Sequence, residues 1–287
     1  MFKHWLLAVR PKTLSMAIAP VLVGTTLAWF EQQQFSLLPL LLTLAAALLI
    51  QIGTNLYNDA ADFERGADTA GRLGPARVVA EGLIPATRVR HGAWLSFALA
   101  LLCGIYLVWL GGWPILLIGL FSLAAAYAYT GGAHPIAYGP FGELFVLVFF
   151  GVIAVAGSAY LQTGIWSAAA VVAGIAIGMP AAAALLVNNY RDLESDCAAG
   201  RRTLVSLLGR RLARRLYAIY ILTPLMLVPL LIPAERVFLP WLVLPPAIVL
   251  VRRFWRSPID SGLNRLLALT AQYQLLFAVL LISAWLF

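Results

Sequence analysis

The sequence predicts an all-α integral membrane protein with nine transmembrane helices, organised as a single membrane domain over residues 1–287. Two observations lead to this prediction. The chain is 62% hydrophobic and only 11% charged, whereas a soluble domain averages about 25% charged residues. Apolar runs near the ~20 residues that a bilayer requires also follow one another along almost the whole chain.

The apolar runs define the expected spans. They lie at residues 14–30, 37–57, 91–110, 113–130, 143–162, 165–188, 212–232, 237–251 and 266–287. Short connections within 91–130 and within 143–188 predict two helical hairpins. The eighth span is short and contains Pro240, Pro245 and Pro246, which interrupt helical hydrogen bonding.

The positions of the basic residues favour one orientation. With nine spans, one face carries the N-terminus and the loops 58–90, 131–142, 189–211 and 252–265. Of the 20 Lys and Arg residues, only Arg236 lies on the other face. Because loops rich in Lys and Arg stay in the cytoplasm, we expect a multi-pass protein of the inner (cytoplasmic) membrane with this face inside. Topology thus accounts for the net charge of +8, and nucleic acid is not an expected partner.

Two polar stretches on this face, residues 55–62 and 188–196, each follow an apolar run. At 100° per residue, helical geometry brings the Asn and Asp residues of each stretch onto one side, within about 60° in the first and about 80° in the second. The residues are Asn55, Asp59 and Asp62 in the first stretch and Asn188, Asp192 and Asp196 in the second.

Carboxylates crowded on one helix face repel each other unless a cation lies between them. Asp59, Asp62, Asp192 and Asp196 therefore predict metal binding, with Mg²⁺ as the hard cation that usually accompanies phosphate groups. A solvated helix end rich in Asp and Asn would explain one such stretch. Two matching stretches at the ends of two apolar helices favour a functional site, because polar groups at membrane depth usually serve function.

Cationic and aromatic residues lie near the two stretches. Arginine suits phosphate oxygens, and the candidate arginines are Arg72, Arg77, Arg191 and Arg201, although topology explains any single one of them equally well. Lys12, at the mouth of the first span, could bind a diphosphate or reach the lipid headgroups. Tyr129, at the end of the fourth span, could stabilise a cation or belong to the interfacial aromatic belt. This combination predicts a substrate with a diphosphate head and an apolar tail, as in polyprenyl diphosphates.

Asn55-x₂-Asn58-Asp59-x₂-Asp62 and Asn188-Asn189-x-Arg191-Asp192-x₃-Asp196 resemble the two Asp-rich motifs of the UbiA superfamily of intramembrane prenyltransferases, and the resemblance covers nearly the full chain. The sequence is most similar to the group that prenylates 1,4-dihydroxy-2-naphthoate in menaquinone biosynthesis. Segments typical of that group are Arg10–Leu14, Asp62–Thr69, Gly74–Val78, Tyr129–Gly132, Gly142–Leu144 and Gly200–Leu204, although Arg201 replaces a usual lysine.

The resemblance implies a UbiA-type bundle in which loops 58–90 and 189–211 are cytoplasmic active-site loops. The expected reaction is Mg²⁺-dependent transfer of a polyprenyl group from its diphosphate to an aromatic acceptor, within the lipid bilayer. Asp59, Asp62, Asp192 and Asp196 would hold the metal. Asn55, Asn188 and the four arginines would bind substrate, while Asp68, Lys12 and Tyr129 would act in acceptor binding, activation or cation stabilisation.

Two other functions fit parts of the sequence. Another aromatic acceptor, such as 4-hydroxybenzoate, is compatible with the same motifs. A membrane transporter also combines apolar helices with polar residues, but its binding residues lie near the bilayer midplane. In this sequence the ionisable residues gather at one face, which favours the enzyme.

Overall fold

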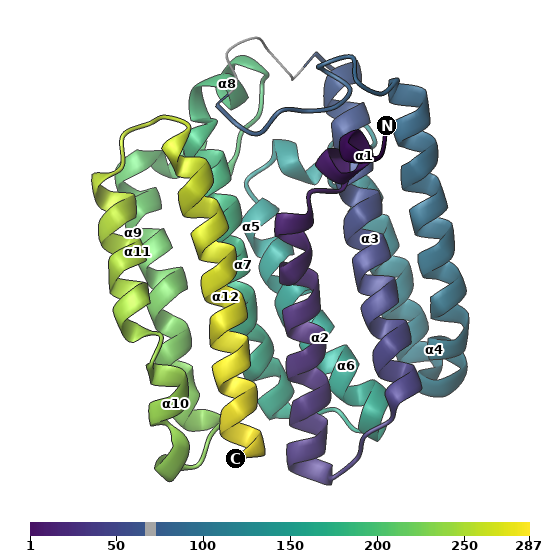
Figure 1. Ribbon diagram of the computed structural model, residues 1–287, viewed down its shortest axis with the longest axis vertical. Coiled ribbons are helices and arrows are strands. Elements are labelled where there is room, and N and C mark those ends of the chain that lie inside the picture. The colour runs from purple at the N-terminus through teal and green to yellow at the C-terminus, as the bar shows by residue number, and fades with distance from the viewer. Residues whose placement is uncertain (67–72) are drawn as a thin grey trace.

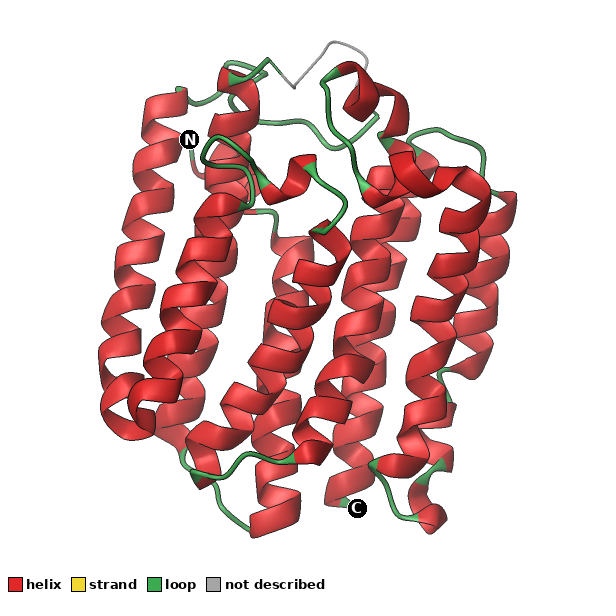
Figure 2. Cartoon of the chain, turned by 180° about the vertical axis from the view of Figure 1, so that it is seen from behind, coloured by secondary structure: helices red, strands yellow, loops and turns green. Residues whose placement is uncertain are grey.

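The chain forms a bundle of helices that run roughly along one common direction (Figures 1 and 2). The structure is a computed structural model and describes residues 1–66 and 73–287. The N-terminus lies at the end of the bundle where α3 and α7 finish, and the C-terminus lies at the opposite end (Figure 1). We call the first of these the arginine-rich end, because nearly all Lys and Arg residues lie in or beside its loops.

Helices make up every long element of the described residues. In chain order they are α1 (Phe2–Val9), α2 (Pro11–Gln32), α3 (Leu37–Glu64), α4 (Ala86–Ala128), η1 (Ile136–Tyr138), α5 (Gly142–Leu147), η2 (Val148–Ile153), α6 (Ala154–Thr163), α7 (Ala168–Arg191), α8 (Leu193–Ala198), α9 (Leu204–Leu227), η3 (Val228–Leu230), η4 (Ala234–Arg236), α10 (Phe238–Trp241), α11 (Leu244–Arg256) and α12 (Gly262–Leu286). The prediction of an all-α membrane bundle is confirmed.

Eight helical stretches of the described chain are long and apolar enough to cross a membrane. The count differs from the predicted nine because α4 contains the third and fourth spans together. Gly112 lies inside α4 with φ 66°, a left-handed conformation that glycine adopts without steric cost, and it divides α4 at the predicted boundary. The predicted eighth span is broken into η4, α10 and α11, as its prolines lead one to expect.

Several helices extend beyond their predicted ends at the arginine-rich end. α3 continues to Glu64 rather than residue 57, and α7 continues to Arg191. Apolar periodicity underestimates these helices because their last turns are polar residues held by tertiary contacts. The second polar stretch is not one unbroken helix, since α7 ends at Arg191 and α8 starts at Leu193. The backbone amides of Asp192 and Asp196 still donate to the carbonyls of Asn188 and Asp192, at 3.0 and 2.8 Å, so the helical spacing of these three residues continues across the interruption.

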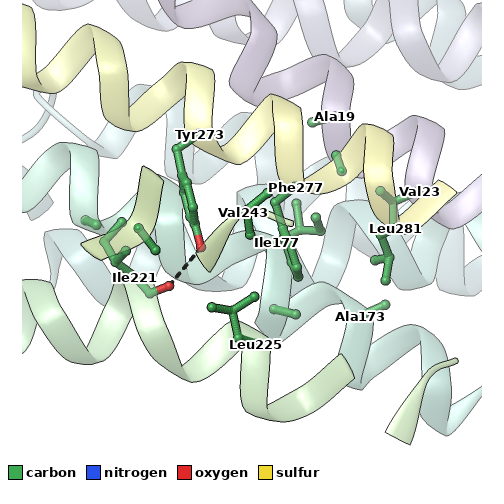
Figure 3. Close-up of a cluster of buried hydrophobic side chains, with 14 of the residues drawn as sticks. Ala19, Val23, Ala173, Ile177, Ile221, Leu225, Val243, Tyr273, Phe277 and Leu281 are labelled. Atoms are coloured by element: carbon green, nitrogen blue, oxygen red, sulfur yellow. Dashed lines mark hydrogen bonds between the residues drawn. The ribbon is translucent and has the colours of Figure 1, made fainter. Parts of the chain in front are cut away.

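The largest apolar core surrounds α7 and α12. Ile177, Phe277 and Leu281 are fully buried there, and Tyr273 donates a hydrogen bond to the carbonyl of Ile221 at 3.0 Å (Figure 3). Small residues bring α7 close to η2, because a Cβ atom at Gly174 would lie 2.6 Å from the Cα atom of Val152. Close packing through small residues is how helices associate in lipid, and here it fixes α7 beside the cavity described next.

Candidate functional site

A cavity of about 590 Å³ lies among α2, α3, α4, α7 and the span formed by α5, η2 and α6. Most of its wall is apolar. Its polar wall, near the arginine-rich end, is formed by Arg10, Asn55, Asn58, Asp62, Arg77, Asn188, Asn189 and Arg201. Leu101 and Ile105 of α4 line the cavity and are 52% and 62% exposed. Its extended apolar wall is suited to a ligand with a long apolar part.

Asn55 connects α3 to the start of the chain. Its amide nitrogen donates to the carbonyl of Val9 at 2.9 Å and to the hydroxyl of Thr13 at 3.2 Å. These two residues flank Arg10, which joins α1 to α2 in a left-handed conformation with φ 55°. Asn55 thereby fixes the position of Arg10, which lines the cavity.

Asp59, unlike Asp62 of the same motif, lies away from the cavity. It is 1% exposed and does not form part of the cavity wall. Its two carboxylate oxygens accept hydrogen bonds from the backbone amides of Val78 and Val79, at 3.2 and 3.3 Å. Asp59 therefore holds the loop after residue 73 against α3, and this loop carries Arg77, which donates to the carbonyl of Asn58 at 2.9 Å.

Asp62 lies where the two polar stretches meet. Its carboxylate accepts from Arg77 at 2.7 Å and from Arg201 at 2.6 Å, and the aspartate is 2% exposed. Arg201 also reaches Asp196 at 3.4 Å, so one guanidinium bridges a carboxylate from each stretch. Burial disfavours the charge of Arg201, but the carboxylates of Asp62 and Asp196 outweigh that effect and raise the pKa of Arg201 above its ordinary value.

Arg201 is also fixed by an aromatic ring. Its guanidinium lies over the ring of Tyr138, 4.5 Å from the ring centre, and donates to the tyrosine hydroxyl at 3.5 Å. A cation over an aromatic face is attracted by the negative face of the ring. Two carboxylates and one ring therefore hold Arg201 in place.

The second stretch is organised around Arg191, which is 1% exposed. Its guanidinium contacts both carboxylate oxygens of Asp192, at 2.7 and 2.5 Å. It also donates to the side-chain oxygens of Asn188 at 2.8 Å and of Asn264 at 2.5 Å. Asn264 belongs to α12 and donates to the carbonyl of Leu73 at 2.8 Å. Arg191 thus joins α7, α12 and the first loop, and it lies outside the cavity wall.

The remaining predicted site residues divide into three groups. Tyr129 lines the cavity. Lys12 is exposed and does not line it, whereas Arg10, two residues earlier, does. Asp68 and Arg72 lie outside the described residues.

Several residues of the site, Arg10 among them, were not among the predicted site residues. Asn58 lines the cavity and accepts a hydrogen bond from the hydroxyl of Thr130 at 2.6 Å. Its position next to Asp59 in the sequence could have identified it as a site residue. Asn189 lines the cavity and donates to buried Glu143 at 2.9 Å, with a similar signal beside Asn188. No signal pointed to Tyr138 or to Asn264, because their partners are distant in sequence.

The oxygen donors at this end of the cavity fit a hard divalent cation. Among residues 1–66 and 73–287, no three His, Cys, Asp or Glu side chains gather as a ready-made metal cluster. The donor set instead combines the carboxylates of Asp62 and Asp196 with the amide oxygens of Asn55, Asn58 and Asn188. Oxygen-only donors of this kind are those that Mg²⁺ prefers. Arg201, a cation that Asp62 and Asp196 share, marks a place where the protein stabilises positive charge.

Known proteins are similar to this chain in sequence and in fold. The sequence matches the UbiA prenyltransferase family over residues 17–269. It is 36% identical over 277 residues to the 1,4-dihydroxy-2-naphthoate octaprenyltransferase of Bacillus subtilis, covering 95% of this chain and 88% of that protein. It is 40% identical over 220 residues to the protein of the same name from Escherichia coli, covering 75% and 71%.

The fold agrees with this match. A UbiA homologue from Archaeoglobus fulgidus, solved with DMAPP and Mg²⁺, superposes with a TM-score of 0.68, covering 97% of this chain and 99% of that one at 16% identity. That similarity supports the fold, while the family match and the closer relatives identify the family. The chain therefore belongs to the UbiA prenyltransferase family and is a multi-pass membrane transferase.

Proposed function

We propose that this protein transfers a polyprenyl group from its diphosphate to 1,4-dihydroxy-2-naphthoate, in an Mg²⁺-dependent step of menaquinone biosynthesis. The observation that carries the proposal is the cavity, which combines a carboxylate and arginines at one end with an extended apolar wall. Such a shape suits a diphosphate head and an isoprenoid tail. The relatives at 36% and 40% identity are named for octaprenyl transfer to this naphthoate.

The diphosphate would bind at the polar end. Arg77 and Arg201 line the cavity there, and guanidinium groups pair well with phosphate oxygens. Arg10 lies on the same wall and adds a third positive charge. The positive charges would stabilise the negative charge that grows on the leaving diphosphate, which is the main way proteins accelerate reactions of this kind.

Mg²⁺, when bound, would neutralise diphosphate charge as a Lewis acid. The proposed ligands are the carboxylates of the two motifs, with help from the amide oxygens of Asn55 and Asn188. Of these carboxylates, Asp62 lines the cavity wall. The others are Asp59, Asp192 and Asp196, whose oxygens contact backbone amides or arginines.

Departure of the diphosphate leaves an allylic cation, which water must not reach before the acceptor does. Tyr129, Phe145, Phe149 and Phe150 line the cavity, and the rings of Phe145 and Phe149 stack with centres 5.7 Å apart. Aromatic faces attract positive charge without offering a nucleophile. These rings would therefore shield the cation until the acceptor attacks it through a ring carbon, with loss of the naphthoate carboxylate in the overall process.

Replacement of Asp62 by Asn tests the polar end. The substitution removes the carboxylate that lines the cavity and is expected to lower kcat at least a hundredfold, about the cost of losing one well-placed electrostatic group. Glu64→Gln is the matched control, because Glu64 lies on the same helix in an exposed pair with Arg90, and it should retain activity. Full activity of the purified, monodisperse Asp62→Asn protein would contradict the proposed role.

A competition assay tests the acceptor. Purified protein is incubated with octaprenyl diphosphate, Mg²⁺ and equal concentrations of 1,4-dihydroxy-2-naphthoate and 4-hydroxybenzoate, and the products are identified by mass. We expect the decarboxylated naphthoate product to dominate. Predominant prenylation of 4-hydroxybenzoate would reject the naphthoate assignment and keep prenyl transfer. Product formation that continues undiminished in EDTA would reject the Mg²⁺ requirement.

We also propose that the protein lies in the inner (cytoplasmic) membrane. Its arginine-rich end would face the cytoplasm, as the distribution of Lys and Arg indicates. Cys197 is exposed at that end, and Cys103→Ser leaves it as the sole thiol. A thiol at the opposite end is obtained with Gln34→Cys in a chain that lacks both native cysteines. In intact cells a membrane-impermeant maleimide should label the Gln34→Cys protein and spare Cys197 until lysis. The reverse pattern would invert the topology.

A further inference from the structure

A second cavity, of about 390 Å³, lies between α11 and α12 at the arginine-rich end. Its wall comes from two matching helix faces, at positions 249, 252, 253 and 256 of α11 and 262, 265, 266 and 269 of α12. Residues with this spacing share one side of a helix. The cavity therefore occupies the groove between the two helices, which lie side by side and are joined at this end by a short loop (Figure 1). It is separate from the proposed prenyl-transfer site.

The wall of this groove carries four arginines, Arg252, Arg253, Arg256 and Arg265. All four are exposed, and no described residue pairs with their guanidinium groups. Asp260, the only acid of the connecting loop, has one carboxylate oxygen engaged by the backbone amide of Gly262 at 2.7 Å. The groove thus concentrates positive charge that the described protein does not neutralise.

Arg265 lies where the local electrostatic potential disfavours a cation. Arg265 lies near the start of α12, where the helix dipole presents its positive end and where no acidic residue occurs in the first turn. The excess of cytoplasmic arginine expected from topology does not require a cation at this position. An anion held between Arg265 and the arginines at the end of α11 would remove the unfavourable interaction, since a helix N-terminus itself favours negative charge.

The depth at which the lining residues lie distinguishes a phospholipid from a free phosphate ion as the ligand. The arginines lie in or next to the last turn of α11 and near the start of α12, whereas aliphatic Val249 and Leu269 lie about two turns from those ends, farther into the bundle. A free phosphate ion would use the arginines alone. A phospholipid would place its phosphate among the arginines and its acyl chains against the aliphatic side chains. Basic pockets between membrane helices bind acidic lipid headgroups in this way.

We propose that the groove between α11 and α12 is a binding site for an anionic phospholipid, with the phosphate held by Arg252, Arg253, Arg256 and Arg265. This site is independent of the proposed prenyl transfer, because none of its four arginines lines the larger cavity. Because these arginines bind the acidic headgroup, the site would give the protein a preference for membranes rich in acidic lipid.

Native mass spectrometry of the purified protein tests this site. The full chain is equilibrated in detergent micelles that contain equal amounts of phosphatidylglycerol and phosphatidylcholine, and the retained lipid is counted. The wild-type protein should retain phosphatidylglycerol preferentially. Arg253→Gln with Arg265→Gln removes one arginine from each helix and should lower this retention about fivefold for each lost charge.

Two matched double variants distinguish lipid binding in the groove from nonspecific attraction of acidic lipid by positive charge. Arg211→Gln with Arg215→Gln removes two exposed arginines of α9 that are outside the groove, and it should keep the preference. Arg253→Lys with Arg265→Lys retains the charges and should keep most of it, which excludes a folding defect as the cause. Any of three results would overturn the proposal: no lipid preference in the wild type, equal loss in the α9 variant, or displacement of the lipid by millimolar inorganic phosphate.

Discussion

The ion bridge from Arg201 to Asp62 and Asp196 is the interaction on which the polar end of the cavity depends. It joins α3 to α8, and therefore joins two stretches that lie more than a hundred residues apart in the sequence. Buried carboxylates are costly unless they are paired. Without the bridge, Asp62 would keep its ion pair with Arg77 but would lose its link through Arg201 to the carboxylate of the second motif.

Other motif residues stabilise this arrangement without lining the cavity. Asp59 holds the loop that carries Arg77, and Arg191 ties α7 to α12 through Asn264. These contacts give the two Asp-rich motifs a division of labour, with some members facing the cavity and others fixing the loops that close it. The exposed position of Lys12 and the cavity position of Arg10 follow from the same network, because Asn55 fixes the junction of α1 and α2.

The sequence predicted the spans well because apolar length and the placement of arginine are local properties. It also identified both polar stretches, since their Asn and Asp residues recur at helical spacing. It could not show that Asp59 contacts backbone amides while Asp62 faces the cavity, because a loop twenty residues away decides between these roles. Asn264 and Tyr138 were missed for a related reason: each gains its importance from a partner at least sixty residues distant.

The most direct test of this account is a double-mutant cycle of Asp62→Asn and Arg201→Gln. The free energy of unfolding is measured for the purified protein in mixed detergent micelles, in which unfolding is first shown to be reversible. Each single variant should lose about 2 kcal/mol, because it removes one charged hydrogen-bond partner from a buried network in which Asp62 keeps Arg77 or Arg201 keeps Asp196. The double variant should lose clearly less than the sum, with a coupling energy of about 1–3 kcal/mol. Losses that add within about 0.5 kcal/mol would show that Arg201 is not coupled to Asp62, and would contradict the bridge between the two motifs.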